Sequence, residues 1–212
     1  MEETRLILVR HGETEWNRDA KIQGQLDVVL SAVGRAQAKR VAGRLAGEEL
    51  AAVYSSDLAR ARETAAIIAE PHCLAVATRP DLREGCFGAW QGLTIAEVQE
   101  RFAENYAAFR QDPVFGRPLD GECIAEVADR AQRAVEEIAA AHPGETVAVV
   151  THGGALKAIV CRLLGLDLAQ RRRFVVDNCS LTVFAWREGL PVLLTLNDTA
   201  HLGGELVADV EV

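Results

Sequence analysis

The stretch LILVRHGETEWN, residues 6–17, opens with an apolar run that ends abruptly in Arg10, His11 and Gly12. A short, continuous, β-branched run of this kind predicts a buried strand over residues 5–9. Burying a guanidinium or an imidazole is costly unless its charge or its hydrogen bonds are compensated. Either the chain reaches the surface directly after this strand, or the strand ends at the edge of a pocket built for an anion.

Composition limits the partners that this chain can have. It has 212 residues, 49% hydrophobic and 25% charged, and we predict a single globular domain over residues 1–212. The formal net charge of −8 argues against nucleic acid or an anionic membrane as the main partner, because both are polyanions. No apolar run approaches the length of about 20 residues that spans a bilayer. The N-terminal residues also lack the features of a secretory signal.

The cysteines indicate the redox compartment. There are five of them, an odd number at wide spacing without a CxxC pair, which argues against a disulfide framework. We therefore expect a reducing environment and a cytoplasmic location.

Strands alternate with helices for most of the predicted length. Strands are expected at 5–9, 51–56, 74–80, 146–151, 180–186 and 191–197, and helices at 32–46, 56–70, 94–109, 122–141 and 155–165. The helix from residue 56 is expected to begin with a capping Ser or Asp, and the last two strands to form a hairpin. This order predicts an α/β fold, a three-layer α/β/α arrangement around a mostly parallel sheet. Residues of about 85–125 are less regular, and we expect a helical insertion there, over one edge of the domain.

Four predicted strand ends carry groups that can bind anions or transfer protons. Arg10 and His11 follow the first strand, Arg60 lies in the first turn after the second, Glu84 follows the third, and His152 follows the fourth. In open α/β sheets, ligands bind at the carboxyl ends of the strands, so these groups should converge.

Together these side chains suit metal-free phosphoryl transfer. Two arginines match a phosphate by bidentate hydrogen bonds, and a neutral histidine nitrogen can act as the nucleophile. A glutamate can protonate the leaving oxygen. The arginines would supply the charge that Mg²⁺ supplies in many phosphotransferases, so neither a metal nor another cofactor is required.

The motif RHGETEWN, together with SSDLARARETA, LREGCFGAWQG, DGEC and VVTHGG in this order, resembles the histidine phosphatase superfamily, the phosphoglycerate mutase-like proteins. The resemblance extends from about residue 4 to about residue 202. It implies a phosphoglycerate mutase-like fold with the helical insertion over the active site. Arg60 is preferred to Arg62 because the family pattern S-x-L-x-R-A-x-x-T begins at Ser56.

The resemblance also implies residue roles. His11 is expected to become a phosphohistidine, and Glu84 to donate the proton. Residues expected to bind the substrate are Arg10, Asn17, Gln23, Gly24, Arg60, His152 and Gly153.

Three functions stay open at this point. The tract FGAWQGLTIAEV resembles the phosphatase branch, which contains α-ribazole phosphatases and metal-independent phosphoserine phosphatases, and we expect hydrolysis of a small soluble phosphate ester. The alternatives are a cofactor-dependent phosphoglycerate mutase and a non-catalytic phosphoester-binding module. Neither the substrate nor the oligomeric state is specified, and a homodimer stays open because relatives include monomers and dimers.

Several residues depart from the family pattern or stay unassigned. Cys123 replaces the usual serine, and Lys21 stands where many relatives have arginine. Arg171–Arg173 are read as a solvated face that could instead rim the site, and His201 is read as either structural or near the pocket.

Overall fold

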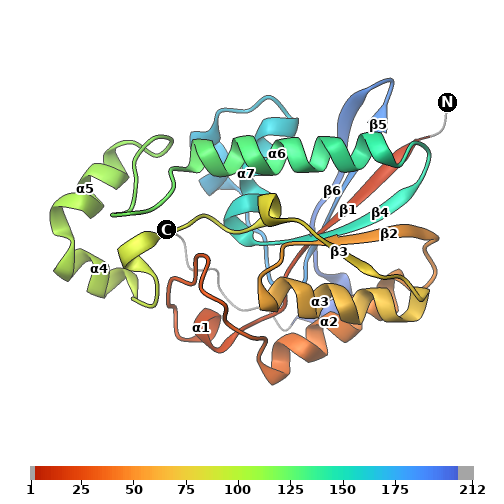
Figure 1. Ribbon diagram of the computed structural model, residues 1–212, viewed down its shortest axis with the longest axis horizontal. Coiled ribbons are helices and arrows are strands. Elements are labelled where there is room, and N and C mark those ends of the chain that lie inside the picture. The colour runs from red at the N-terminus through yellow and green to blue at the C-terminus, as the bar shows by residue number, and fades with distance from the viewer. Residues whose placement is uncertain (1–2, 205–212) are drawn as a thin grey trace.

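The computed structural model describes residues 3–204, so the first two and last eight residues of the predicted domain lie outside the described part. A six-stranded sheet in the order β3-β2-β4-β1-β5-β6 forms its centre (Figure 1). The strands are β1 (Thr4–Arg10), β2 (Leu50–Ser55), β3 (Val76–Thr78), β4 (Thr146–Thr151), β5 (Leu181–Arg187) and β6 (Leu190–Asp198). The first four strands pair in parallel, and the β5–β6 hairpin adds two antiparallel strands at one side.

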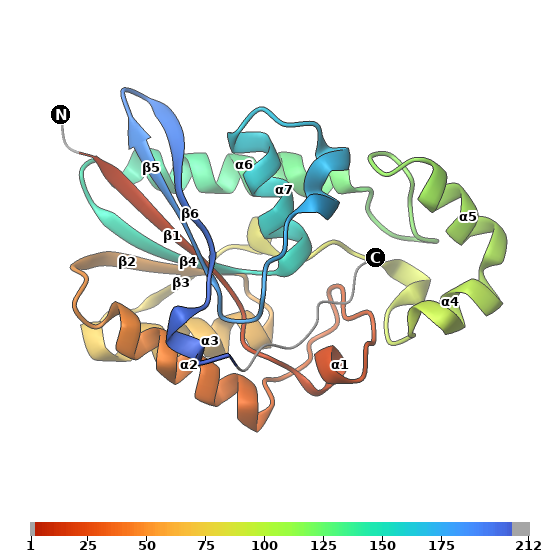
Figure 2. The same ribbon diagram turned by 180° about the vertical axis from the view of Figure 1, so that it is seen from behind.

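Helices cover both faces of this sheet. The α-helices are α1 (Glu15–Arg18), α2 (Ala32–Leu45), α3 (Ala59–Ala69), α4 (Ile95–Arg101), α5 (Ala103–Gln111), α6 (Ile124–Ala141) and α7 (Gly153–Leu163). Short 3₁₀ turns are η1 (Glu70–His72), η2 (Pro80–Leu82), η3 (Gly88–Trp90), η4 (Leu168–Arg173) and η5 (Ala200–Leu202). Helices α2 and α3 lie on one face and α6 and α7 on the other (Figures 1 and 2). The predicted three-layer α/β/α fold is confirmed.

The apolar run of β1 is continuous because the strand is buried on both faces. Leu6 and Leu8 pack into the core beneath α6 and α7, whereas Ile7 and Val9 pack into the core beneath α2 and α3. Successive side chains of a strand point to opposite faces, so residues 6–9, which are covered on both sides, are all apolar.

The register of β1 against β4 brings two predicted site segments together. Arg10 pairs with Thr151 at the parallel carboxyl ends of these strands. The residues that follow, His11 and His152, therefore leave the sheet side by side.

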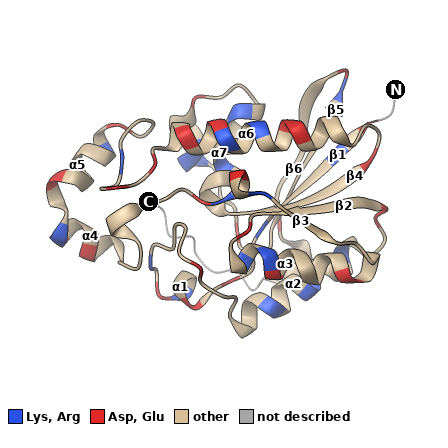
Figure 3. Cartoon of the chain, viewed as in Figure 1, with Lys and Arg blue, Asp and Glu red and all other residues tan. Residues whose placement is uncertain are grey.

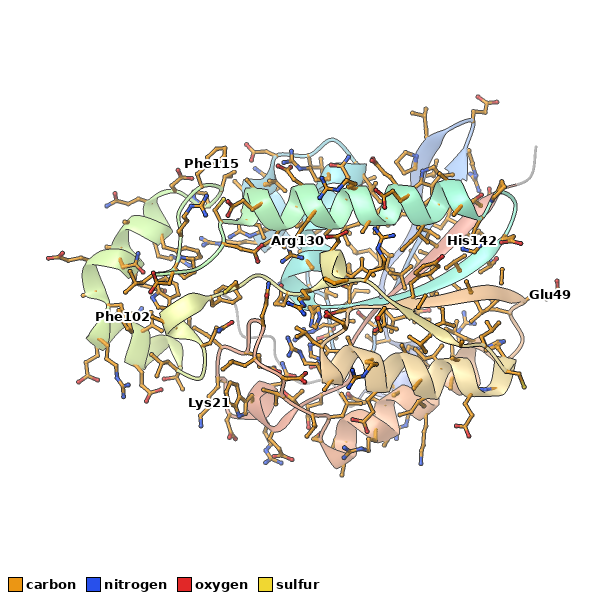
Figure 4. The ribbon with its side chains drawn as sticks, in the orientation of Figure 1. Lys21, Glu49, Phe102, Phe115, Arg130 and His142 are labelled. Atoms are coloured by element: carbon orange, nitrogen blue, oxygen red, sulfur yellow. The ribbon has the colours of Figure 1, made fainter. Side chains whose placement is uncertain are left out.

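One predicted helix is two helices in the structure. The helix expected over residues 94–109 is broken at Phe102, which lies between α4 and α5 (Figure 4). The break turns α5 so that Phe109 and Tyr106 pack against the fully buried Trp90. Helical periodicity continues across this corner, so the sequence pattern alone does not reveal it.

The predicted cap of α3 is also wrong. Helix α3 begins at Ala59, and neither Ser56 nor Asp57 caps it. Instead, the Asp27 carboxylate accepts a hydrogen bond from the Ala59 backbone N–H over 2.6 Å. Asp57 forms a bidentate ion pair with Arg83. The loop before α2 is thereby fastened to the start of α3.

Within residues 3–204, no helix is both long enough and apolar enough to cross a membrane.

Candidate active site

His11 lies directly beyond β1, and its hydrogen bonds define its tautomer. Nδ1 lies 2.7 Å from the Gly12 carbonyl oxygen, which can only accept, so Nδ1 carries the proton. Nε2 accepts a 3.3 Å hydrogen bond from Nε of Arg60. Burial, followed by the charges of Arg60 and Arg10, holds the pKa of His11 well below its usual value of 6.5. The ring is therefore neutral, with the Nε2 lone pair directed toward Arg60.

Residues 176–180 form hydrogen bonds with Arg10 and with the backbone of His11. The Asn178 side chain donates to the His11 carbonyl oxygen over 2.9 Å, and the Cys179 N–H lies within reach of the Arg10 and His11 carbonyls. The Arg10 guanidinium donates to the Val176 carbonyl oxygen over 2.6 Å. Asn178 was not expected from the sequence, although the polar pair Asp177 and Asn178 interrupts an otherwise apolar stretch before β5.

Arg60 lies in the first turn of α3 and is 1% exposed. Besides its bond to His11, it donates to the carbonyl oxygens of Gly24 at 2.6 Å and Leu26 at 2.8 Å. Burial lowers the pKa of Arg60 to about 10, and Glu84 opposes that shift. The guanidinium stays charged at neutral pH, and it holds the loop at 24–26 over the site.

His152 is completely buried, and its ring centroid lies 5.1 Å from that of His11. Neither of its ring nitrogens has a hydrogen-bond partner among residues 3–204. Burial, followed by the charge of Arg60, lowers the pKa of His152 well below 6.5. A buried polar group without a partner is rare and calls for an explanation. A bound phosphate oxygen would supply the missing partner.

Glu84 lies against the N-terminal end of α7. Its carboxylate oxygens accept hydrogen bonds from the backbone N–H groups of Gly85 at 2.9 Å, Gly154 at 2.9 Å and Ala155 at 3.1 Å. A Cβ atom at Gly154 would lie only 2.6 Å from this carboxylate, so this approach requires a glycine. The glycine break after His152 therefore lets Glu84 reach the pocket.

Arg130 of α6 fixes the segment that carries Glu84 (Figure 4). Its guanidinium donates to the backbone carbonyls of Arg83 at 2.6 Å and Glu84 at 2.8 Å, and it forms a two-point ion pair with Glu122. The sequence analysis missed Arg130, because an arginine in an Ala- and Glu-rich helix gives no signal of this contact.

The remaining expected substrate-binding residues also line the pocket. Asn17 is buried, and its side-chain oxygen accepts from the backbone N–H and hydroxyl of Thr14, so its amide N–H₂ group is the part that can donate to a ligand. Gly24 has φ +52°, and a Cβ there would lie 2.2 Å from the Gln91 side-chain oxygen. A Cβ at Gly153 would lie 3.3 Å from the Arg10 guanidinium.

These groups open into one pocket that contains about 990 Å³ of space, its open mouth included. Of the predicted residues, its walls include Arg10, His11, Asn17, Gln23, Gly24, Arg60, Glu84 and Gly153. His152 lies behind this wall, against His11. Apolar side chains, among them Phe87, Phe109 and Val127, form another part of the wall.

The structure answers the questions left by the unassigned residues. The solvated-face reading is wrong for Arg171, which is buried and lines the pocket together with Arg172. His201 lies outside the pocket wall, and its Nε2 contacts the Cys179 carbonyl oxygen at 2.9 Å. Cys123 precedes α6, where the Glu126 carboxylate accepts its backbone N–H over 3.1 Å, a contact that does not need the serine hydroxyl.

The arrangement can bind a phosphate ester and attack it. Two arginines and the N-terminal end of α7 supply positive potential, and Nε2 of His11 supplies a lone pair beside them. Within the described residues, no group of three or more His, Cys, Asp or Glu side chains is placed to hold a metal ion.

Comparison with known proteins agrees with this geometry. The family model described as "Histidine phosphatase superfamily (branch 1)" matches residues 6–199. Phosphoserine phosphatase 1 of Hydrogenobacter thermophilus is 40% identical over 94% of both chains. A metal-independent phosphoserine phosphatase of Arabidopsis thaliana is 42% identical over 95% of this chain and 84% of its own length. Other relatives are named "Phosphoglycerate mutase-like protein 4", of Arabidopsis thaliana, and "Probable phosphoglycerate mutase GpmB", of Yersinia enterocolitica.

A solved structure extends the similarity to three dimensions. A phosphoserine phosphatase mutant of Entamoeba histolytica in complex with phosphoserine superposes with a TM-score of 0.85. It is 33% identical, and the alignment covers 94% of this chain and 99% of that one.

Proposed function

This chain belongs to the histidine phosphatase superfamily and is a phosphoric monoester hydrolase, and from this premise we propose that it hydrolyses a small phosphate ester through a phosphohistidine at His11. The observation that carries the proposal is the tautomer of His11. Its proton is held on Nδ1 by the Gly12 carbonyl, so Nε2 faces the pocket as a free base once substrate is bound.

The phosphate would be held by the groups around this nitrogen. Arg10 and Arg60 neutralise its oxygens, and Asn17 and His152 donate further hydrogen bonds. When a phosphate oxygen replaces Nε2 of His11 as the acceptor of the Arg60 Nε–H hydrogen bond, the Nε2 lone pair becomes free to attack phosphorus. The protonated nitrogen of His152 then gains an acceptor, which it lacks in residues 3–204.

Glu84 is the proton donor in this proposal. As the bond from Nε2 to phosphorus forms, the bond from phosphorus to the ester oxygen breaks, and Glu84 protonates that oxygen. In the second step, Glu84 takes a proton from a water molecule that attacks the phosphohistidine. Inorganic phosphate leaves, and neutral His11 and protonated Glu84 are restored.

Phosphoserine is the substrate that we propose to test first. Two relatives of this chain are named phosphoserine phosphatases, and the solved relative is described in complex with phosphoserine. A small phosphorylated metabolite thus stays the proposed ligand. The cytoplasmic location and a homodimer stay predictions.

Trapping the intermediate tests the mechanism. Rapid quenching with ³²P-labelled phosphoserine should give an acid-labile, base-stable label in the peptide that contains residues 6–17. His11→Ala should abolish the label and lower kcat by at least about 10³-fold. Label on His152, or near-normal turnover by His11→Ala, would overturn the assignment. Activity should also survive EDTA, and loss restored by Mg²⁺ or Zn²⁺ would contradict the metal-free chemistry.

A mutase is the second candidate, because some relatives are named as phosphoglycerate mutases. The two functions differ in their products from 3-phosphoglycerate. A phosphatase releases inorganic phosphate and glycerate, whereas a mutase supplied with a bisphosphoglycerate cofactor yields 2-phosphoglycerate. We expect phosphate release to predominate.

A further inference from the structure

The segment NDTAHL, residues 197–202, ends β6 and forms η5, and none of its residues lines the active-site pocket. It packs against α2 (Figure 2). Helix α2 carries Lys and Arg but no Asp or Glu (Figure 3), and its Arg40 donates to the Leu202 carbonyl oxygen over 2.5 Å. The Leu202 side chain is completely buried in the core beneath α2 and α3. The segment is therefore anchored to the body of the domain.

Two side chains of this segment hold the loop that precedes β5. The Asn197 side-chain oxygen accepts from the Asp177 backbone N–H at 2.7 Å, and its N–H₂ group donates to the Asp177 carboxylate at 2.8 Å. Nε2 of His201 lies 2.9 Å from the Cys179 carbonyl oxygen, which can only accept, so Nε2 carries the proton. Burial lowers the pKa of His201 below its usual value of 6.5, so the ring donates as a neutral group at neutral pH. The loop is thus fixed at two points.

The same loop holds the backbone of the proposed nucleophile. The Asn178 side chain donates to the His11 carbonyl oxygen over 2.9 Å. The Cys179 N–H lies 3.0 Å from the Arg10 carbonyl oxygen and 3.3 Å from that of His11. One peptide-bearing residue, Cys179, therefore connects His201 to His11, and a shift of this loop would move the backbone from which the His11 ring projects.

The conformation of Cys179 makes this connection sensitive. Its φ of +58° lies in the left-handed region, which residues other than glycine rarely adopt. Such a conformation persists only where surrounding contacts enforce it. The contacts here are the carbonyls of Arg10 and His11 on its N–H and the His201 ring on its carbonyl. Without the donor from His201, the Cys179 backbone can relax toward an ordinary φ, and its N–H then leaves the His11 carbonyl.

We propose that His201, together with Asn197, is a positioning residue that keeps the His11 ring aligned for attack on phosphorus by holding the loop at 177–179. This inference rests on the proposed role of His11 and goes beyond it, because it assigns a part in catalysis to a segment outside the pocket. A displacement of about 1 Å can lower the rate of an aligned reaction by about 10²-fold. Arg60, which would bind the phosphate, is held by the carbonyls of another loop, so phosphate affinity should suffer less than the rate.

A split between rate and binding tests the proposal. His201→Leu removes the donor to the Cys179 carbonyl. The kcat/KM for p-nitrophenyl phosphate, which reports on phosphoryl transfer to His11, should fall by about 10- to 100-fold. The inhibition constant of inorganic phosphate should change by less than about threefold. His201→Gln, whose amide N–H₂ group can donate in place of Nε2–H, should recover most of the lost rate. Thr199→Ala, at a half-buried position of the same segment, is the matched control and should change neither quantity.

Asn197→Gly is the second variant, and it carries the test if His201→Leu does not fold. Asn197 has φ +55°, which glycine adopts without strain, so a loss there reports on the contacts with Asp177 and not on the backbone. We expect the same split between rate and phosphate affinity as in His201→Leu, at a smaller size.

Three outcomes overturn the inference. The first is a kcat/KM within about threefold of the unsubstituted chain in both His201→Leu and Asn197→Gly. The second is a fall in phosphate affinity as large as the fall in rate, which would indicate a general loosening of the pocket. The third is an equal loss in His201→Gln and His201→Leu, which would exclude the hydrogen bond to Cys179 as the cause. All three leave the proposed function standing, whereas an unsubstituted chain that forms no phosphohistidine at His11 would overturn both.

Discussion

Nε of Arg60 donates a hydrogen bond to Nε2 of His11 over 3.3 Å, while the same guanidinium holds the carbonyls of Gly24 and Leu26. One buried cation thus touches the proposed nucleophile and fastens the loop above it. Its charge also lowers the pKa of His11, in addition to the larger effect of burial. The side chain that would bind the phosphate therefore adds to the effect of burial in keeping the proposed nucleophile neutral.

The first prediction concerns the acid limb of the pH–rate profile. Because the pKa of His11 lies well below 6.5, His11 stays unprotonated as the pH falls through 6.5. We expect kcat/KM for p-nitrophenyl phosphate to show no half-loss near pH 6.5, and the decline to begin at lower pH. A stopped assay across pH 4.5–8 measures this. His142→Asn, which alters a histidine bonded to Tyr54 and Glu145 outside the pocket, should give the same profile. A half-loss near pH 6.5 in both proteins would contradict the lowered pKa.

The second prediction concerns stability. Burial lowers the pKa of both His11 and His152, so below about pH 6.5 the unfolded chain binds protons that the folded chain does not. The free energy of unfolding should therefore fall with falling pH, by up to about 1.4 kcal/mol per pH unit for each histidine. Above about pH 7 both histidines are neutral in the folded and in the unfolded chain, so none of this stability is lost.

Urea unfolding of His152→Asn isolates one of the two contributions. Its free energy of unfolding should depend less steeply on pH between 6.5 and 5 than that of the unsubstituted chain. Its offset from the unsubstituted chain should stay constant between pH 7 and 8. Identical slopes below pH 6.5 would show that His152 is not held neutral by burial.

The convergence of the site could be predicted from the sequence because it follows from strand direction. Arg10, His11 and His152 come directly after two parallel strands, and parallel strands end at one edge of a sheet. The family pattern then distinguished Arg60 from Arg62, which lies two residues further along the same helix. These four positions could be predicted because each is set by its distance along the chain from a strand end or a motif residue.

The supporting residues depend on tertiary contacts, and those leave no periodic signal. Arg130 and Asn178 act through backbone carbonyls far away in the chain, to Glu84 and His11 respectively. The cap of α3 comes from Asp27, more than thirty residues before the helix, so the local Ser and Asp were misleading.

The third prediction tests Arg130 as a positioning residue. Arg130→Met removes the donors to the Arg83 and Glu84 carbonyls and leaves Glu122 without its ion pair. We expect kcat for phosphoserine to fall by about 10- to 100-fold, because the general acid is displaced. For p-nitrophenyl phosphate, whose leaving group needs no proton, kcat/KM should fall much less than it does for phosphoserine. Arg133→Met, an exposed arginine of the same helix, is the matched control. Equal losses on both substrates would show that Arg130 supports the fold and does not position the general acid.

The last prediction concerns Glu84 itself. Its carboxylate accepts hydrogen bonds from the Gly154 and Ala155 N–H groups, at the N-terminal end of α7. Glu84→Gln keeps the shape of the side chain but removes the transferable proton. Turnover of phosphoserine, which releases a poor alkoxide leaving group, should fall by about 10²–10⁴-fold. For p-nitrophenyl phosphate, kcat/KM should fall far less, because it reports on phosphoryl transfer to His11 alone. Its kcat should fall after a burst of p-nitrophenol, because hydrolysis of the phosphohistidine also needs this carboxylate. A plot of log kcat/KM against leaving-group pKa should therefore become steeper in Glu84→Gln than in the unsubstituted enzyme. If the two slopes are the same, the proton comes from another group, and the assignment of Glu84 as general acid is wrong.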